Sequence, residues 1–505
     1  MAEQRGLLIG ARIASGTVGT AAAALVIAAV AFLPLPTVGP AARTVTVEPA
    51  PADQLRVCPG AAMRVGDEAG ENADAVFAIG VAATAGAAGG GALERTRLAS
   101  ADPAAASAAA PELLRAAAAD GDLVAGAQSQ DVDASGFRGF AAASCAEPSG
   151  SIWLVGGAMT VGRSTFLVLS NPTDVPSRVG LEIFGEDGRV AAPGTSGIEV
   201  PANGQRILSL AGFAPGVQSP VVHVVARGGR VVATLQQSIV RGLDDVGVET
   251  VGGGADPRAS LVLPGVRIVD AIGTNRASAL SDWQDVAPVI RLIAPGDVAG
   301  RATVRVVPET EGSIGTSFTV KLEPGVATEV ALDNGVPEGA GQEGAAEESD
   351  VHGLAEGVYT VFVDADVPVV AGVRVSTAVD SGVEPAPDAI LDAPDSDLAW
   401  FSAAPPLEGE TLVVVPDGPS PLATIVNPTT DDVEVEVAPL GGAAPTLVTV
   451  VAGTAFSVPL ASGAYRLSGT DGLSISVTFA GAAALASFVL APPRPVAGAI
   501  VVHPD

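Results

Sequence analysis

Short stretches in which apolar and polar residues alternate recur along the chain from Ser151 onward. Three of them begin at a proline, and apolar residues stand seven and nine positions after each one. The prolines are Pro172, Pro295 and Pro428, and the apolar residues are Val179, Leu181, Ala302, Val304, Val435 and Val437. Alternation with a period of two places one face of a strand on a core and the other in water. The pattern therefore predicts three related β units in which these six residues face cores.

The same series of features follows each of these stretches: a turn with glycine, a glycine before another strand, and an apolar closing strand. The middle copy is longer by an acidic, Gly-rich loop over 338–356. Short strands at regular spacing between Gly and Pro turns are typical of β-sandwiches. We therefore predict a mainly β protein with three tandem β-sandwich (Ig-like) units, at 151–258, 259–392 and 393–505.

The first and third stretches begin with Asn-Pro-Thr, at Asn171 and Asn427, and the middle one with Ala-Pro-Gly at Ala294. The residue before a proline is restricted to extended geometry, and the proline has no N–H to donate. We therefore expect Asn171 and Asn427 to end one strand each and to lie at equivalent turns.

An uncharged apolar run extends from Ile13 to Leu35 near the N-terminus. A helix rises 1.5 Å per residue, so this run is long enough for a hydrocarbon core about 30 Å thick. Arg5 and Arg12 precede it and favour a cytoplasmic tail at 1–12. We predict a transmembrane helix at 13–35 in a single-pass cell-membrane protein whose bulk is extracytoplasmic. A cleaved signal peptide is the alternative, although its apolar region is normally about 7–15 residues.

A Pro-rich spacer at 36–54 follows, and then a membrane-proximal region at 55–150. The chain has 2 cysteines, Cys58 and Cys145, and they bound this region. An even number of cysteines in an exported chain indicates a disulfide, with two free buried thiols as the alternative. We therefore predict a Cys58–Cys145 disulfide. Within the region we expect a flexible loop at 80–91, and a short helix or a loop at 102–119.

Charge excludes one large class of partner. The formal net charge is −30, with 26 basic and 56 acidic residues, and Lys321 is the one lysine. Binding to a phosphate backbone needs clustered Lys and Arg. No nucleic-acid partner is therefore expected.

Few residues are candidates for catalysis or metal binding. The 3 histidines, His223, His352 and His503, lack zinc-ligand spacing, and no G-x-S-x-G motif occurs. The stretch that starts at Asp131 opens like a calcium loop, but position 12 of that loop is Ala142 rather than an acid. We therefore predict no enzymatic activity, no metal and no cofactor. A hydrolase that uses His223 or a close carboxylate pair is an alternative.

The segment from Ala141 to Gly188 carries a Cys–Trp–Gly-Gly–Asn-Pro series, formed by Cys145, Trp153, Gly156, Gly157, Asn171 and Pro172. It resembles an actinobacterial family of membrane-anchored or secreted proteins known only as a domain of unknown function. The resemblance covers most of the chain after Cys58. It implies no catalytic residues, and it implies genes close to those of envelope glycosyltransferases.

We therefore expect a non-enzymatic cell-envelope protein that acts as a structural or accessory module by protein contact. Its expected partner is an envelope glycosyltransferase or another envelope protein, in support of glycan assembly. A glycan-binding module is a further alternative. Sugar-binding platforms present exposed aromatic rings, so burial of all 3 Trp and 2 Tyr residues would argue against it.

Overall fold

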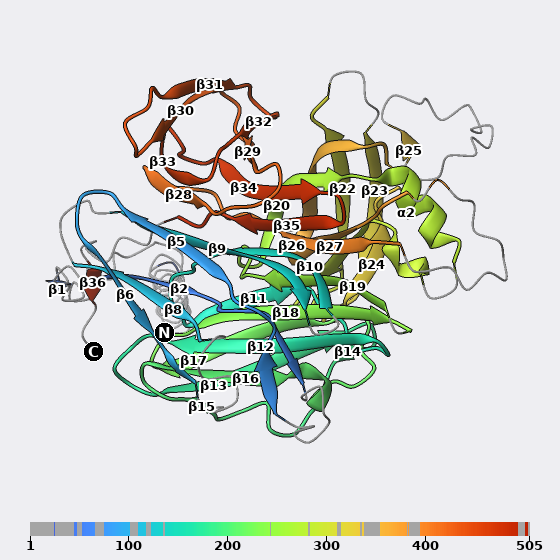
Figure 1. The fold of residues 1–505 in the computed structure, drawn as a ribbon, viewed down its shortest axis with the longest axis horizontal. Coiled ribbons are helices and arrows are strands. Elements are labelled where there is room, and N and C mark those ends of the chain that lie inside the picture. The colour runs from blue at the N-terminus through green and yellow to red at the C-terminus, as the bar shows by residue number, and fades with distance from the viewer. Residues whose placement is uncertain are drawn as a thin grey trace, which may run out of the picture. The chain divides into compact units, whose positions relative to one another are not determined.

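Strands dominate the computed structural model, and the mainly β class is confirmed (Figure 1). The structure describes residues 25, 45–47, 53–65, 75–100, 110–117, 123–134, 137–242, 244–280, 283–310, 315–333, 336–337, 354–380, 382, 394–492 and 500–502. The chain divides into one unit of 1–50 with 496–505 and another of 51–495. In the former, β1 (Val45–Val47) pairs antiparallel with β36 (Ile500–Val502).

Within these ranges, no helix has the length and apolar character needed to cross a membrane. The predicted anchor at 13–35 lies outside the described residues except for Leu25.

The first β unit consists of two sheets, ordered β11-β17-β13-β14 with β15 on β13, and β19-β18-β12-β16. Its strands are β11 (Ser151–Val155), β12 (Arg163–Asn171), β13 (Ser177–Gly185), β14 (Gly188–Arg189), β15 (Ile198–Val200), β16 (Gly204–Ser209), β17 (Val221–Gly228), β18 (Val232–Arg241) and β19 (Asp244–Val251), and a 3-10 turn, η2 (Leu210–Gly212), follows β16. Buried residues of both sheets form one core, so the two sheets face each other.

The second β unit is built around one long strand that belongs to two sheets. Its elements are β20 (Arg258–Ile268), α2 (Ala271–Ser278), η3 (Gln284–Val286), β21 (Val289–Ile293), β22 (Gly300–Pro308), β23 (Thr316–Leu322), β24 (Thr328–Ala331), β25 (Val336–Pro337), β26 (Gly357–Ala378) and β27 (Ser396–Ser402). The first half of β26 pairs with β20 and β22, and its second half pairs with β21 and β27. The sequence pattern predicts two strands here, and the structure has one.

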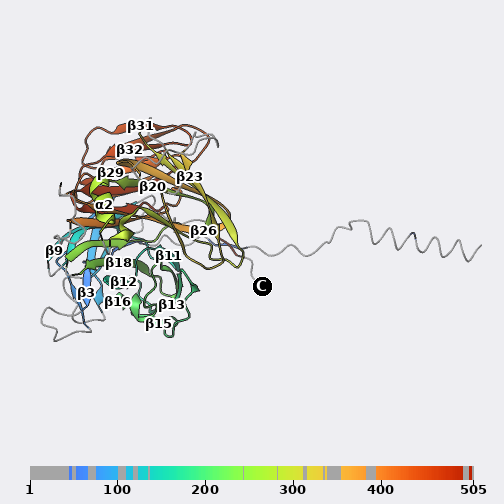
Figure 2. The ribbon, with the colours of Figure 1, turned by 90° about the vertical axis from the view of Figure 1, so that its right-hand side faces the viewer.

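The third β unit has sheets ordered β28-β33-β30-β31 and β32-β29-β34-β35. Its strands are β28 (Thr411–Val415), β29 (Leu422–Val426), β30 (Val433–Pro439), β31 (Thr446–Val450), β32 (Ala455–Pro459), β33 (Gly463–Ser468), β34 (Ser474–Gly481) and β35 (Ala484–Val489). In both views, β31 and β32 lie at the opposite end from β13 and β15 (Figures 1 and 2).

One pairing order recurs in all three units. We number the strands within each unit, counting β14 and β15 as one strand, leaving out the two-residue β25 and counting the halves of β26 separately. Strands 1-6-3-4 then form one sheet and strands 8-7-2-5 form the other. In the immunoglobulin fold, strand 1 pairs with strand 2 and strand 7 pairs with strand 6. Here strand 1 pairs with strand 6 and strand 7 pairs with strand 2, so strands 1 and 7 have exchanged sheets. The Ig-like order therefore applies only to the central pairs 2-5 and 3-6.

The six residues predicted to face cores are all buried, with exposed fractions of 0–6%. Asn171 and Asn427 are both fully buried at equivalent corners. Each side-chain N–H₂ group donates to two backbone carbonyls, and each side-chain oxygen accepts from the N–H and the hydroxyl of the threonine two residues on. Both predictions are confirmed.

The second unit extends beyond the predicted end at residue 392. Strand β27 pairs with β26 along Gly372–Ala378, although it lies within the range predicted for the third unit. The Pro- and Asp-rich stretch before β27 therefore connects two strands of one sheet. A Pro- and Asp-rich composition is typical of connecting segments, and these occur within a unit as readily as between units.

The region at 55–150 is also built from strands. They are β2 (Gln54–Cys58), β3 (Met63–Val65), β4 (Val76–Ala78), β5 (Ala83–Ala88), β6 (Leu93–Arg97), β7 (Ala99–Ser100), β8 (Glu112–Ala116), β9 (Val124–Ala134) and β10 (Phe137–Ser144). Strand β5 replaces the loop predicted at 80–91, and β8 replaces part of the helix or loop predicted at 102–119. Both gain partners distant in sequence, β9 for β5 and β2 and β6 for β8, and these pairings outweigh local composition.

Candidate functional site

The predicted Cys58–Cys145 disulfide is present. Both cysteines are buried and pack with Leu114 of β8. The backbones of Val57 and Ala146 exchange two hydrogen bonds beside it, so the disulfide joins the start of the region to its end.

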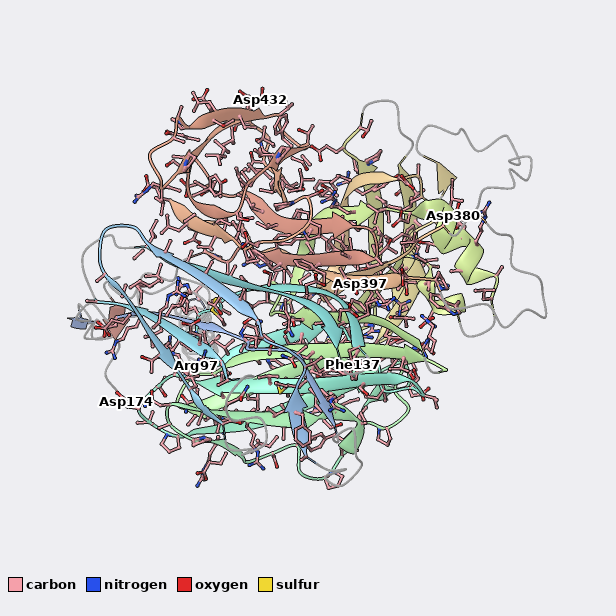
Figure 3. The ribbon with its side chains drawn as sticks, in the orientation of Figure 1. Arg97, Phe137, Asp174, Asp380, Asp397 and Asp432 are labelled. Atoms are coloured by element: carbon pink, nitrogen blue, oxygen red, sulfur yellow. A yellow bond between two sulfur atoms is a disulfide. The ribbon has the colours of Figure 1, made fainter. Side chains whose placement is uncertain are left out.

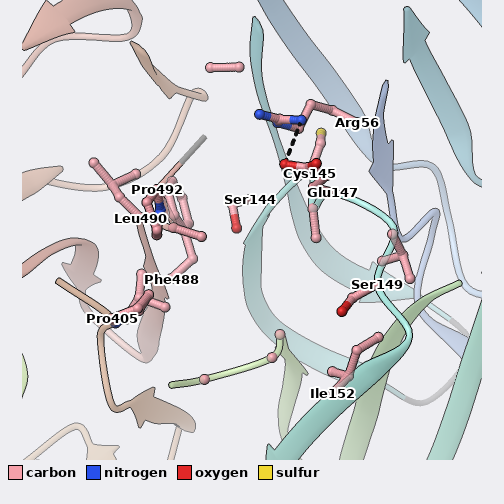
Figure 4. Close-up of a pocket in the computed structure, with 18 of the residues that line it drawn as sticks. Arg56, Ser144, Cys145, Glu147, Ser149, Ile152, Pro405, Phe488, Leu490 and Pro492 are labelled. Carbon is pink, nitrogen blue, oxygen red and sulfur yellow. Dashed lines mark ion pairs between the residues drawn. The ribbon is translucent and has the colours of Figure 1, made fainter. Parts of the chain in front are cut away.

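A cavity of about 340 Å³ lies next to this disulfide (Figure 4). The disulfide region, the first β unit and the third β unit form most of its walls, and Arg258 at the start of β20 adds a residue of the second unit. Wall residues from these parts include Arg56 and Glu147, Ser151 and Ile152, and Leu412 and Phe488. The volume is at the lower end of the range of small-molecule sites, about 300–1,000 Å³.

An ion pair between a buried arginine and a partly exposed glutamate lies in the wall of the cavity. Arg56 Nη1 lies 3.4 Å from Glu147 Oε2, and the arginine is only 8% exposed. Burial lowers the pKa of Arg56, and the charge of Glu147 partly opposes that shift. On another wall the buried hydroxyl of Thr411 has no hydrogen-bond partner in the described part of the chain. The cavity thus combines a donor-rich cation, a carboxylate and a hydroxyl with apolar walls.

Three polar side chains meet on the outer face of the first unit. His223 Nδ1 lies 2.9 Å from Glu182 Oε2, and His223 Nε2 lies 2.9 Å from Ser151 Oγ. A carboxylate only accepts hydrogen bonds, so Nδ1 donates to Glu182 and Nε2 is left to accept the Ser151 hydroxyl proton. This is the order of groups in a nucleophile, a general base and an orienting acid.

Their surroundings hold the three side chains in place. The imidazole of His223 stacks on Trp153, with centroids 4.1 Å apart and an interplanar angle of 5°. Arg189 donates to the other oxygen of Glu182 at 2.6 Å. Ser151 is exposed and also borders the cavity. The sequence gives no sign of this group, because the three residues lie on separate strands, β11, β13 and β17, that only the sheet register brings together.

A buried carboxylate joins all parts of 51–495. Asp397 of β27 is 1% exposed and accepts hydrogen bonds from the amides of Phe140, Val248 and Leu485 at 2.8, 3.3 and 3.0 Å. These amides belong to β10, β19 and β35. Figure 3 places Asp397 where these strands converge. Burial raises the pKa of Asp397 well above its usual value, and the donated amides oppose that shift.

Space for this carboxylate depends on a glycine. A Cβ on Gly139 would lie 2.7 Å from Asp397 Oδ1 and 2.7 Å from the amide nitrogen of Val248. Gly139 also has a φ of +147°, which side-chain-bearing residues rarely adopt. The junction therefore requires both Asp397 and Gly139.

A second carboxyl group is buried close to the first. Glu249 is fully buried, and neither of its oxygens has a hydrogen-bond partner among the residues that the structure describes. Burial, and next the charge of Asp397, raise the pKa of Glu249 well above its usual value. The backbone amide of Trp400 favours the charged form of Glu249, but it does not form a hydrogen bond with either carboxyl oxygen. The fold therefore favours the protonated form of Glu249.

Arg291 of β21 connects the second unit to the first. It is fully buried and donates to the carbonyls of Gly157, Pro220 and Gln218 of the first unit at 2.6–3.3 Å. Glu329 balances its charge at 2.6 Å. Its guanidinium also lies 4.4 Å from the ring centroid of Trp400. Burial lowers the pKa of Arg291 to about 10, so it stays charged at neutral pH.

All five large polar aromatic residues are buried. The exposed fractions are 7% for Trp153, 5% for Trp283, 1% for Trp400, 2% for Tyr359 and 9% for Tyr465. No tryptophan or tyrosine of this chain therefore offers an exposed ring for sugar stacking, which argues against an aromatic glycan platform.

Other sequence candidates have no described site. His352, His503 and residues 338–353 of the acidic loop lie outside the described residues. Asp131 and Asp133 lie in β9. In the described ranges, no group of three or more His, Cys, Asp and Glu side chains is arranged to hold a metal ion.

Comparison with known proteins identifies a family without a known role. No curated protein matches the sequence. Six solved chains match, among them a structure titled "Crystal Structure of Thermotoga maritima 1070", which is 13% identical and covers 30% of this chain and 93% of its own. Its TM-score of 0.18 supports no structural argument. The Family of unknown function (DUF5719) matches residues 98–342 and 341–461, which together exceed half of the 505 residues. The chain therefore belongs to this family of unknown function.

Proposed function

We propose that this protein is a membrane-anchored, extracytoplasmic module of the cell envelope that works by holding a partner protein. In this proposal residues 13–35 form the anchor, and 51–495 act as one rigid body. The partner is a membrane protein of envelope glycan assembly. The disulfide is consistent with folding outside the cytoplasm, where such bonds persist.

Asp397 is the observation that carries this proposal. A chain of independent domains needs no buried carboxylate that binds the disulfide region, the first unit and the third unit at once. Buried polar groups of this kind are costly unless fully bonded, and they fix one arrangement of the elements that they join. A fixed arrangement is what a partner needs if it contacts more than one unit.

Crosslinking in intact cells tests the proposal. We expect the full-length protein to form a defined crosslinked complex with another membrane protein. A variant that lacks residues 1–35 but carries a cleavable export signal should be released from the membrane and lose that complex. Recovery of uncrosslinked protein alone would contradict the proposal.

The Ser151–His223–Glu182 group favours a second candidate function, hydrolysis of an ester by acyl transfer. Ser151 Oγ would attack the carbonyl carbon while His223 Nε2 takes its proton and then passes it to the leaving alkoxide. Water would release the acyl group from Ser151 in the second half of the reaction. The cavity that Ser151 borders offers space for the substrate.

A fluorophosphonate probe distinguishes the two candidates, because it labels only activated serines. A hydrolase predicts labelling of the wild type that is lost in Ser151→Ala and His223→Ala. It should be unchanged in Ser164→Ala, another exposed serine of the first unit. If the probe does not label the wild type, Ser151, His223 and Glu182 form only a polar contact across three strands.

A further inference from the structure

Strand β31 is a free sheet edge. It is the last strand of the order β28-β33-β30-β31, and no other strand in the described ranges pairs with its outer side. Figure 1 shows it at the outer margin of the third unit. A free edge presents unpaired N–H and C=O groups to any extended chain, and proteins normally protect such edges.

The other two units protect the equivalent edge. In the first unit strand 4 is reduced to β14 and β15, of two and three residues. In the second unit β25 pairs with the start of β23, and β23 carries Lys321, the single lysine of the chain. Short length, coverage and an edge lysine are three standard means of blocking strand addition. Strand β31 has five residues, Thr-Leu-Val-Thr-Val, and none of these protections.

The side chains beside this edge combine apolar and acidic groups. Leu447 and Thr449 lie directly opposite Glu436 and Glu434 of β30, so the four share the outer face of the sheet. Leu447 is 63% exposed. No Lys or Arg occurs in the sequence between Arg374 and Arg466, and Arg466 of the neighbouring strand β33 forms its ion pair with Glu410.

The core side of the edge is open as well. Phe456 of β32 lies opposite the buried Ile425, which places its ring on the core side of the second sheet. It is nevertheless 45% exposed, and Val451 at the end of β31 is 51% exposed. The margin between β31 and β32 therefore leaves apolar surface that one more strand would cover.

We propose that β31 is the docking edge for an extended segment of a partner protein, which adds to this sheet as a further strand. The segment carries apolar side chains toward Phe456 and Val451 and Lys or Arg side chains opposite Glu434 and Glu436. Main-chain hydrogen bonds supply affinity in this mode, and alternate side chains supply specificity. A second copy of this acidic chain is disfavoured as occupant, because like charges would face each other. The inference rests on the proposed function and names the contact through which it operates.

A synthetic peptide that alternates Lys and Val tests the edge directly, with binding to the full-length chain followed by fluorescence anisotropy. We expect this peptide to bind, and we expect a peptide of equal charge with a central proline not to bind, because proline cannot extend a ladder. Leu447→Lys and Thr449→Lys should each weaken binding about tenfold or more, since an edge lysine blocks addition and repels the peptide.

Val298→Lys is the matched control, because Val298 is 66% exposed in another unit and the substitution adds the same charge. It should leave binding unchanged. If Leu447→Lys and Val298→Lys weaken peptide binding equally, the change in net charge explains the loss and the proposal is overturned. Equal binding of the proline peptide would overturn it too.

Photo-crosslinkers placed at 447 and at 298 in intact cells separate this inference from the proposed function. A heterologous adduct at 447 alone supports both. Adducts at 298 but not at 447 overturn the edge and keep the accessory function. Adducts at neither position argue against the β31 docking edge and against the accessory function. A homodimer crosslinked through 447 would show that a second copy occupies the edge, which would overturn the proposed partner.

Discussion

At the residue scale, Asn171 and Asn427 show how a short motif determines a corner. An asparagine side chain has two donors and an acceptor, and both residues use all of them on backbone groups and the following threonine. The intervening proline needs no partner for its nitrogen. The middle unit has alanine at this position, so the corner forms without asparagine but with fewer bonds.

Asn427→Ala should therefore destabilise the protein by about 1–3 kcal/mol, because buried carbonyls lose their donors. Asn171→Ala should cost a similar amount, and the two effects should add, since the sites share no partner. Urea denaturation measures both. Asn275→Ala, at an exposed position of α2, is the control and should change stability by less than about 0.5 kcal/mol. Equal effects of Asn275→Ala and Asn427→Ala would refute the role given to the corner.

Glu249 makes stability depend on pH. Its pKa is raised in the fold above the ordinary value of 4.5. Below pH 4.5 both states hold the proton and the contribution is fully present. Above it only the unfolded state releases the proton, so the free energy of unfolding falls by about 1.4 kcal/mol per pH unit until the folded pKa is reached.

Glu249→Gln should remove this loss, because glutamine resembles the protonated side chain and does not titrate. Its stability relative to wild type should rise with pH above about 4.5 and stay constant below. Chemical denaturation at a series of pH values measures the difference. Glu434→Gln, on the exposed face of β30, should give a curve parallel to wild type. A parallel curve for Glu249→Gln would mean that the fold does not raise the pKa of Glu249.

At the element scale, single strands of one unit carry contacts that hold another. Strand β21 has Ile290 and Leu292 in the core of the second unit, while Arg291 between them points at the first. The period-two alternation that builds one core thus supplies the interface from the opposite face.

Arg291→Met should cost about 3–5 kcal/mol, because three carbonyls lose their donor and Glu329 loses its counterion. Arg305→Met is the matched control. Arg305 pairs with Asp364 at 3.6 Å, both side chains are about half exposed, and such pairs contribute about 1 kcal/mol or less. Urea denaturation of both variants measures the contrast. Similar losses in the two variants would show that Arg291 does not hold the interface.

At the scale of the whole molecule, Asp397 predicts cooperative unfolding of 51–495. Strands from the disulfide region, the first unit and the third unit donate to one carboxylate of the second unit, so no unit can leave without breaking that junction. Asp397→Asn puts an N–H₂ group among amide donors. We expect one calorimetric transition in wild type and at least two in Asp397→Asn.

The neighbouring Asp395→Asn provides the control, because the Asp395 side chain is 59% exposed and forms an ion pair with Arg138 on the surface. It should keep the single transition. Separate transitions in wild type would show that the units unfold independently in spite of the junction.

Much of the architecture could be predicted from the sequence because it depends on local patterns. Alternation at Val179 and Leu181 places them in a core whatever the partner strand is. The Asn-Pro-Thr corners are closed by bonds within a few residues and to the next strand. The two cysteines of the chain have only each other to pair with. The alternation and the corners depend only on nearby residues, and two cysteines allow only one pairing.

The tertiary structure alone decided which distant groups meet. Nothing near Asp397 in the sequence indicates that three separate strands donate to it, and nothing near Ser151 points to His223 or Glu182. Composition could not distinguish the connection before β27 from an interdomain linker. The freedom of the β31 edge is likewise a property of the whole sheet. Such features follow from strand order and register, and those are determined by the total free energy of packing many segments together rather than by any one of them.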